Sequence, residues 1–253
     1  MDISTVGSLA AFVLILVFLV VLRAKNSKFE VRVTDIVVAV LPVVLFLLIT
    51  GRIQSLQIGE LKVETAFKQA SQTPITSQIA PLKGLPTEPI QLDPKRGVEE
   101  VPRLVEKKTE GLLFRLGHGG YYGPAVREYF QILGQHPFLR FVIIENPDRT
   151  FFGMAGAPDL AALFSGSSGD QLADQFARSL NAGDRSSLQK LPGFIPAEKA
   201  LSETAVKTQA LRQMEEQNLE HLPVINRERR FLGIVNRSRL TASLIIDVAQ
   251  GLK

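Results

Sequence analysis

Residues 221–240 decide the fold, and they read HLPVINRERRFLGIVNRSRL. Two short apolar runs, 221–225 and 231–235, are separated by the polar stretch NRERR, which is typical of a turn between two strands. Apolar residues recur at helical spacing upstream, over 205–217, and again downstream, over 240–248. The sequence therefore predicts the order helix, strand, turn, strand, helix.

The same pattern of elements occurs earlier in the chain. Two apolar runs, 140–144 and 151–155, again flank a polar turn, and a helix is expected on either side. FGMAGAPDL, residues 152–160, aligns without a gap on LGIVNRSRL, residues 232–240. The sequence therefore predicts an internal repeat, although the first copy lacks the Pro-Val pair of the second.

The second copy resembles a CBS domain, and the repeat resembles the pair of such domains called a Bateman module. The residues that carry the resemblance are ALRQM at 210–214, LEHLPV at 219–224 and FLGIVNRSRL at 231–240. It implies an α+β fold of tandem βαββα units. It also implies a regulatory module that forms a homodimer or higher oligomer and binds an adenine nucleotide, AMP, ADP or ATP, between its halves. Because no effector domain is recognised in this sequence, an unidentified membrane or cytoplasmic effector is the expected partner.

The ligand signature of this family is Gly-apolar-x-Thr/Ser-x-x-Asp, in which the Asp contacts ribose hydroxyls. In the second copy Asn236 replaces the Thr and Arg239 replaces the Asp, and Arg cannot accept a hydrogen bond. The first copy keeps Gly153 and Asp159, so the resemblance implies that Asp159 holds the ribose; the alternative is that it only caps a helix. Arg239 could face a phosphate, with a solvated surface Arg as the alternative. The degenerate signature also leaves open a structural scaffold or dimerisation module that has lost its ligand.

A glycine-rich segment, GHGGYYG at 117–123, follows an expected strand and precedes an expected helix. The backbone N–H groups of Gly119 and Gly120 could face a phosphate, and the ring of Tyr121 or Tyr122 could stack on a base. The spacing does not fit the dinucleotide fingerprint, because Tyr122 stands at its third glycine position. The alternative is a flexible loop with packed tyrosines.

Composition excludes several classes of protein. Among 253 residues there is no Cys and there are only three His, so a thiolate or His-rich metal site is not expected. The net charge of +4 is small and gives no reason to expect nucleic acid as a partner. No Ser-His-Asp elbow, HExxH or kinase signature is present, so the chain is not expected to be an enzyme.

The N-terminal region, 1–51, is predicted to be a transmembrane hairpin in the lipid bilayer. Residues 3–22 carry no charge and are long enough to span, and a second uncharged run, 36–51, contains Pro42. A re-entrant or interfacial helix is the alternative for this second run. Four basic residues in the short loop against three beyond the second run slightly favour an external C-terminal domain. Nucleotides are cytoplasmic, however, so we expect a multi-pass inner-membrane protein with residues 52–253 in the cytoplasm.

Composition also divides the remaining chain. Residues 52–70 alternate in hydropathy and are predicted to form a membrane-proximal β element, with a helix continuing from the hairpin as the alternative. Residues 71–97 are rich in Pro and are predicted to be an extended linker, with docking along a partner as the alternative. The expected remaining parts are the first CBS-like unit at 98–164, an insertion at 165–193 with a helix over 170–180, and the second unit at 194–253.

Overall fold

The computed structural model describes residues 63–92 and 99–251 of the chain. The predicted membrane hairpin, 1–51, lies outside the described residues. Within them, each helix is too short or too polar to cross a bilayer.

The described residues divide into two compact units, which we name the sheet unit and the helical unit. The sheet unit contains 75–92, 99–205 and 220–236, and the helical unit contains 63–74, 206–219 and 237–251.

The first copy of the repeat forms a mixed four-stranded sheet in the order β1-β2-β3-β4. Its strands are β1 (Gly111–Arg115), β2 (Phe141–Glu145), β3 (Phe151–Gly156) and β4 (Ile195–Pro196). β1 runs parallel to β2, and the other neighbours are antiparallel. Parallel neighbours need a long crossover, and helix α5 (Gly123–Leu133) lies in this connection.

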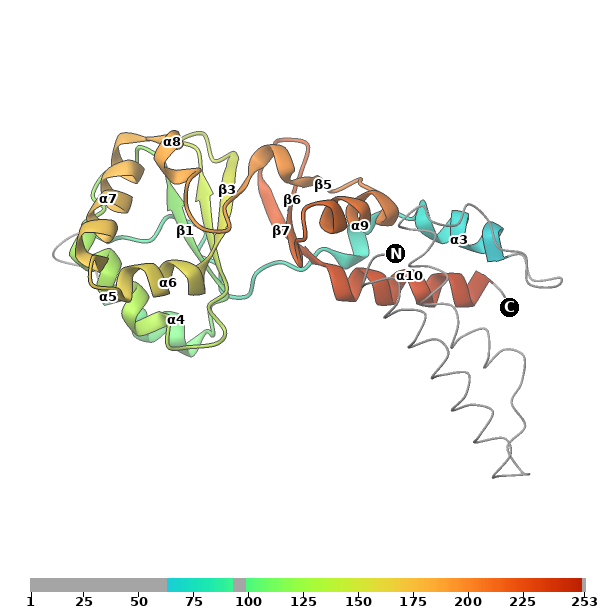
Figure 1. Cartoon of the computed structure of the whole chain (residues 1–253), viewed down its shortest axis with the longest axis horizontal. Coiled ribbons are helices and arrows are strands. Elements are labelled where there is room, and N and C mark those ends of the chain that lie inside the picture. The colour runs from blue at the N-terminus through green and yellow to red at the C-terminus, as the bar shows by residue number, and fades with distance from the viewer. Residues whose placement is uncertain (1–62, 93–98, 252–253) are drawn as a thin grey trace, which may run out of the picture. The chain divides into compact units, whose positions relative to one another are not determined.

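Helices cover one face of this sheet (Figure 1). Besides α5 they are α4 (Val101–Glu106), α6 (Ala157–Ser165), α7 (Gly169–Ala182) and α8 (Arg185–Leu188). The helix predicted inside the insertion is present as α7, and it belongs to the core. The ring of Phe176 on α7 packs edge-on against Phe114 of β1, with 5.4 Å between centroids, and it also contacts Phe164 of α6. The insertion therefore completes the core of the first copy.

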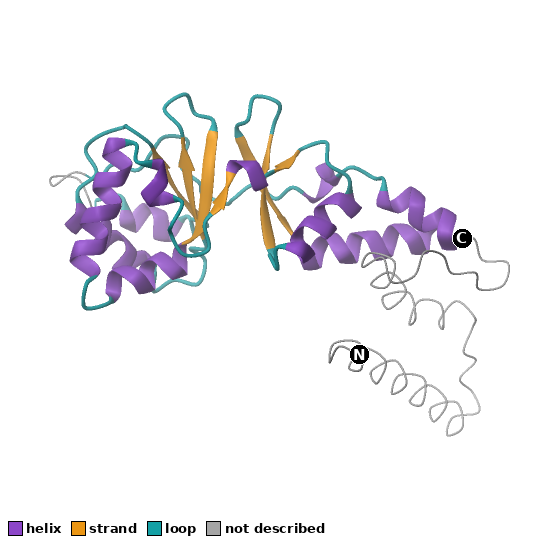
Figure 2. Cartoon of the chain, turned by 45° about the horizontal axis from the view of Figure 1, so that its top comes forward, coloured by secondary structure: helices purple, strands orange, loops and turns teal. Residues whose placement is uncertain are grey.

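The second copy forms a three-stranded sheet with the same pattern of strands. Its strands are β5 (Leu201–Ser202), β6 (His221–Ile225) and β7 (Phe231–Asn236). β5 runs parallel to β6 and β6 antiparallel to β7. The pair Phe141↔Gly156 corresponds to His221↔Asn236, 80 residues later, and each hairpin has a register shift at the same position. The predicted repeat is therefore confirmed at the level of strand topology and register, and the two sheets lie side by side (Figure 2).

The Pro-rich segment differs from the predicted spacer. It is extended, as expected, apart from the short 3-10 helix η1 (Ile75–Gln78), but it packs against the sheet unit. Ala80 exchanges two backbone hydrogen bonds with Ile234 of β7, at 2.8 and 2.9 Å, and Ile90 donates one to Leu113 of β1. The residues between the prolines keep their N–H groups, and apolar side chains among them are buried. Residues 75–92 are thus part of the fold.

The segment predicted to form a membrane-proximal β element is helical where the structure describes it. Residues 63–71 form helix α3 (Val63–Ser71), and the rest of the predicted element lies outside the described residues. Ala66 and Ala70, four residues apart, lie on one face of α3 and are buried. α3 packs with α9 (Lys207–Glu216) and α10 (Arg237–Gly251) to form the helical unit. This packing selects the helix over the alternating strand pattern.

Candidate functional site

The strand register places the predicted site residues at two opposite ends of the first sheet. We name the end at which Phe141 pairs with Gly156 the helix end, because β3 enters α6 there. We name the end at which β2 turns into β3 the turn end; Arg115, the last residue of β1, also lies there, paired with Glu145. Five-residue strands separate the two ends by about 15 Å. Asp159 lies at the helix end and the glycine-rich segment at the turn end, so they do not form one site.

Asp159 lies in the first turn of α6 and is exposed. Its carboxylate folds back over Gly156, the N-cap, which has no side chain to cap the helix. A Cβ on Gly156 would lie 2.5 Å from Oδ2 of Asp159, and one on Gly193 would lie 3.4 Å from the same oxygen. Two glycines therefore make room for the carboxylate, which stabilises the positive end of the helix and remains open to solvent.

Gly153 has a packing role that the sequence did not reveal. A Cβ on Gly153 would lie 2.1 Å from Cζ of Phe194, so the absent side chain makes room for this ring. Phe194 is half-buried, and its ring centroid lies 5.5 Å from that of Phe152. It directly follows Gly193, the neighbour of Asp159. The segment LPGFIP at 191–196 was the available signal, since its single aromatic directly precedes β4.

A basic side chain lies at the same end. The carbonyl of Arg140, which precedes β2, accepts a hydrogen bond from the N–H of Ala157 at 3.0 Å. Its Nη2 donates to Nε2 of His221 at 2.7 Å, and Nδ2 of Asn236 donates to the same nitrogen at 3.0 Å. Burial and the charge of Arg140 lower the pKa of His221. A nitrogen that accepts two hydrogen bonds carries no proton, so the imidazole is neutral here.

In the second copy, two of the signature residues contact other parts of the protein. A Cβ on Gly233 would lie 2.4 Å from the carbonyl oxygen of Ala80, so this glycine admits the backbone of the extended segment. Asn236, at the position of the signature Thr, bonds to His221 and to Glu220. Arg239 is an exposed residue of α10 in the helical unit, and its role toward a phosphate stays a prediction.

At the turn end, the glycine-rich segment has left-handed backbone at Gly117, Gly119 and Gly120, with φ of 66°, 74° and 79°. Tyr121 is a core residue, 5% exposed, whose hydroxyl accepts a hydrogen bond from the N–H of Arg115 at 2.9 Å. Burial raises the pKa of Tyr121 to about 12. Of the two tyrosines, Tyr122, which is 45% exposed, is the one whose ring is open to solvent, and stacking on a base stays a prediction.

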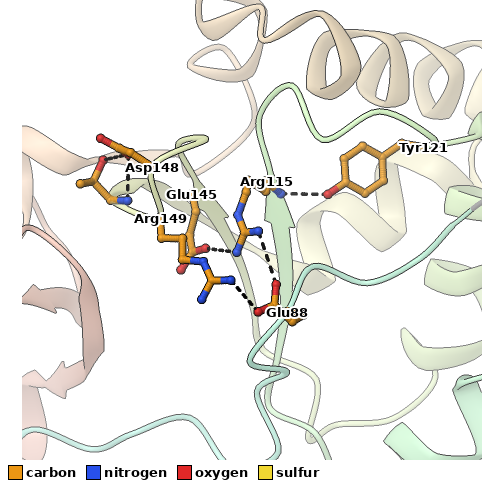
Figure 3. Close-up of polar contacts among 7 residues, drawn as sticks. Glu88, Arg115, Tyr121, Glu145, Asp148 and Arg149 are labelled. Atoms are coloured by element: carbon orange, nitrogen blue, oxygen red, sulfur yellow. Dashed lines mark hydrogen bonds and ion pairs between the residues drawn. The ribbon is translucent and has the colours of Figure 1, made fainter.

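Four charged side chains connect the extended segment to the turn end (Figure 3). Arg115 bonds to Glu88 at 3.4 Å and to Glu145 at 3.2 Å, and Arg149 bonds to Glu88 at 2.8 Å. Burial raises the pKa of Glu145, while its bond to Arg115 acts in the opposite direction. The network ties β1, β2 and the following turn to residue 88.

One segment of the chain, in the second copy, matches a known family model. Residues 199–245 match the family model described as the CBS domain. The first copy, which this match does not cover, has the same strand order and register as the second. No curated protein matches.

Several solved structures are similar to this chain, each with a TM-score of 0.40 or less. The CBS-pair protein CBSX2 from Arabidopsis thaliana is 15% identical, with 68% of this chain and 94% of that chain covered and a TM-score of 0.35. A CBS domain pair/ACT domain protein from Thermotoga maritima is 17% identical, with 69% and 98% covered and a TM-score of 0.36. CbpB in complex with c-di-AMP is 15% identical, with 75% and 98% covered and a TM-score of 0.40.

Proposed function

We propose that this chain is a membrane-anchored regulatory protein whose CBS pair binds an adenine nucleotide at the helix end of the first copy. The observation that carries the proposal is the exposed carboxylate of Asp159, for which Gly156 and Gly193 leave room. No such acceptor exists at the equivalent position of the second copy, where Arg239 stands. The expected occupancy is therefore one nucleotide per chain.

Each side chain at the helix end suits one part of a nucleotide. A carboxylate can accept hydrogen bonds from two ribose hydroxyls at once. The ring of Phe194 offers an aromatic surface for a base. The guanidinium of Arg140 suits a phosphate, since its planar fork can donate two parallel hydrogen bonds. Nucleotide binding would then compete with the bond from Arg140 to His221, which links the two copies.

The regulatory part of the proposal rests on the CBS resemblance and on the chain connections of the helical unit. α3 is the described element nearest in sequence to the predicted hairpin, and it packs with α9 and α10 of the second copy. We therefore expect α3 to be the described element through which regulation reaches the hairpin. Assembly into a homodimer or higher oligomer, an unidentified effector and a cytoplasmic location at the inner membrane belong to the same proposal.

Thermal unfolding of the full chain in detergent tests nucleotide binding. A ligand that binds only the folded state at a hundredfold excess over its Kd stabilises by about 2.7 kcal/mol, or about 5–10 °C in Tm for a chain of this size. Asp159→Asn removes the charged acceptor with little change in shape, so it should abolish most of the shift produced by AMP, ADP or ATP. Glu128→Gln, which changes an exposed carboxylate on α5, is the matched control and should keep the full shift.

The second candidate function is that of a structural scaffold, and two features of the second copy favour it. Its signature glycine admits the backbone of Ala80, and Arg239 replaces the ribose acceptor. Absence of a Tm shift with all three nucleotides at millimolar concentration would decide for the scaffold.

A further inference from the structure

An open cleft with a volume of about 580 Å³ lies at the turn end, away from Asp159. It is lined by the β2–β3 turn, α8, the 3-10 helix η2 (Ala197–Lys199) and the β6–β7 turn. Its polar and charged lining residues are Asn146, Asp148, Thr150, Arg185, Gln189, Glu198 and Arg229. The volume lies in the range of small-molecule sites.

Arg185 is held in position at this cleft. Its Nη2 donates to Oδ1 of Asn146 at 3.0 Å, and its guanidinium carbon lies 5.8 Å from the ring centroid of Phe152. Nδ2 of Asn146 in turn donates to Oγ1 of Thr150 at 2.8 Å, which fixes the amide. A guanidinium has five N–H donors, so several remain for a ligand.

Arg229 lines the cleft from the second copy, at the position equivalent to Arg149 in the first. Both residues have left-handed backbone, with φ of 61° and 67°. The carbonyl of Arg229 accepts a hydrogen bond from the N–H of Phe151 at 2.8 Å, which anchors its backbone beside the first copy. Arg149 pairs with Glu88, whereas the guanidinium of Arg229 has no ion-pair partner among residues 63–92 and 99–251.

The two acids that line the cleft differ in their hydrogen bonding and exposure. Asp148 accepts hydrogen bonds from the N–H and hydroxyl of Thr150, at 3.0 and 2.7 Å, and these bonds lower its pKa. This carboxylate is therefore engaged within its own turn. Glu198 is exposed, and both carboxylates carry a negative charge that opposes an anion.

We propose that this cleft binds the phosphate group of a small phosphorylated polyol or sugar, at a site separate from the nucleotide site. Two guanidinium groups suit a phosphate, because each can donate two hydrogen bonds to its oxygens. Phe151 and Phe152 are 1% and 6% exposed, so the cleft offers no open ring for a base. Amide side chains, such as Gln189, suit the hydroxyls of a polyol instead.

Calorimetric titration of the full chain in a phosphate-free detergent tests the site, with glycerol 3-phosphate as the ligand and glycerol as the uncharged control. Arg229→Gly removes the guanidinium and suits the left-handed backbone, so it should not destabilise the fold. It should weaken binding about tenfold or more. Arg149→Gly is the matched control at the equivalent turn and should change binding less than about twofold. Glu198→Gln should tighten binding, because it removes one of the two opposing charges of the cleft.

Three outcomes would overturn the proposal. Binding of glycerol 3-phosphate could be undetectable at millimolar concentration, Arg149→Gly could weaken it as much as Arg229→Gly does, or Asp159→Asn could abolish it. The last result would place the phosphate at the helix end. Retained binding in Asp159→Asn, with loss in Arg229→Gly, supports a second site whether or not the chain binds nucleotides.

Discussion

The ring of Phe194 occupies the space that a side chain at Gly153 would fill: a Cβ built on Gly153 would lie 2.1 Å from Cζ of Phe194. Gly153 is a signature residue of the first copy, yet its nearest neighbour is a side chain from the segment that joins the two copies. The equivalent Gly233 likewise admits the segment that precedes the first copy, at Ala80. In both copies the glycine allows close packing of a connecting segment.

Alanine at these two glycines should destabilise the fold to different degrees. Gly153→Ala meets a side-chain ring that can shift, so a cost of about 1–3 kcal/mol is expected from overpacking. Gly233→Ala meets the backbone of Ala80 and should cost more, because the hydrogen-bonded bridge to β7 must move. Chemical denaturation measures both, and Gly166→Ala, whose Cβ meets nothing closer than 3.6 Å, is the control. Equal costs in all three variants would contradict this account.

Removing one partner of the buried ion pair in the helical unit should destabilise the fold more than removing the other. Nζ of Lys207 donates to Asp247 at 2.5 Å and to Ser243 at 2.7 Å, and the lysine side chain is 2% exposed. Asp247→Ala leaves this cation buried without its anion and should cost about 3 kcal/mol. Lys207→Met should cost less, because the carboxylate of Asp247 is 31% exposed and can be hydrated. The free energies of unfolding of the two variants check this order, which the opposite ranking would refute.

His221 should make stability depend on pH. Its pKa in the fold lies below that of an ordinary histidine, through burial first and the charge of Arg140 second, while Glu220 acts in the opposite direction. The unfolded chain therefore takes up the proton first as pH falls. The contribution of His221 to stability is present above the unfolded pKa and is lost as pH decreases through the folded pKa.

His221→Gln keeps an acceptor for Arg140 but cannot titrate. The difference in unfolding free energy between this variant and the wild type should change between pH 8 and pH 5.5, in favour of the variant at low pH. Because the two proteins share all other titrating groups, such as Glu145, the contributions of those groups to the pH dependence cancel in the difference. Parallel pH profiles would show that His221 does not contribute.

Asp184 should hold α8, and with it Arg185, in place. Its carboxylate accepts hydrogen bonds from the N–H groups of Ser186 and Ser187 and from both hydroxyls, which lower its pKa to about 2. Asp184→Ala should therefore increase amide hydrogen exchange in α8 and weaken glycerol 3-phosphate binding together. Asp170→Ala, at the start of α7, is the control and should leave exchange in α8 unchanged. Unchanged hydrogen exchange in Asp184→Ala would show that α8 does not need this cap to stay folded.

Patterns local in sequence predicted much of the fold. The strands at 221–225 and 231–236, their turn and the equivalent strands of the first copy follow from apolar runs and polar turn residues. The repeat follows from an ungapped alignment, because equivalent hairpins need the same side chains at the same spacing. Helix α7 was also predictable from its own periodicity, although its place in the core was not.

Tertiary structure alone decided which residues share a site. Asp159 and the glycine-rich segment were both candidates for contact with a nucleotide, and the parallel pairing of β1 with β2 places them at opposite ends of one sheet. Phe194 reaches Gly153, and Arg229 reaches Phe151, through connecting segments and turns that are distant in sequence. Periodicity reports which face of an element is buried, and it contains no information about which distant segment covers that face. The sequence therefore determined the elements and the repeat, while packing between distant segments decided which side chains became neighbours.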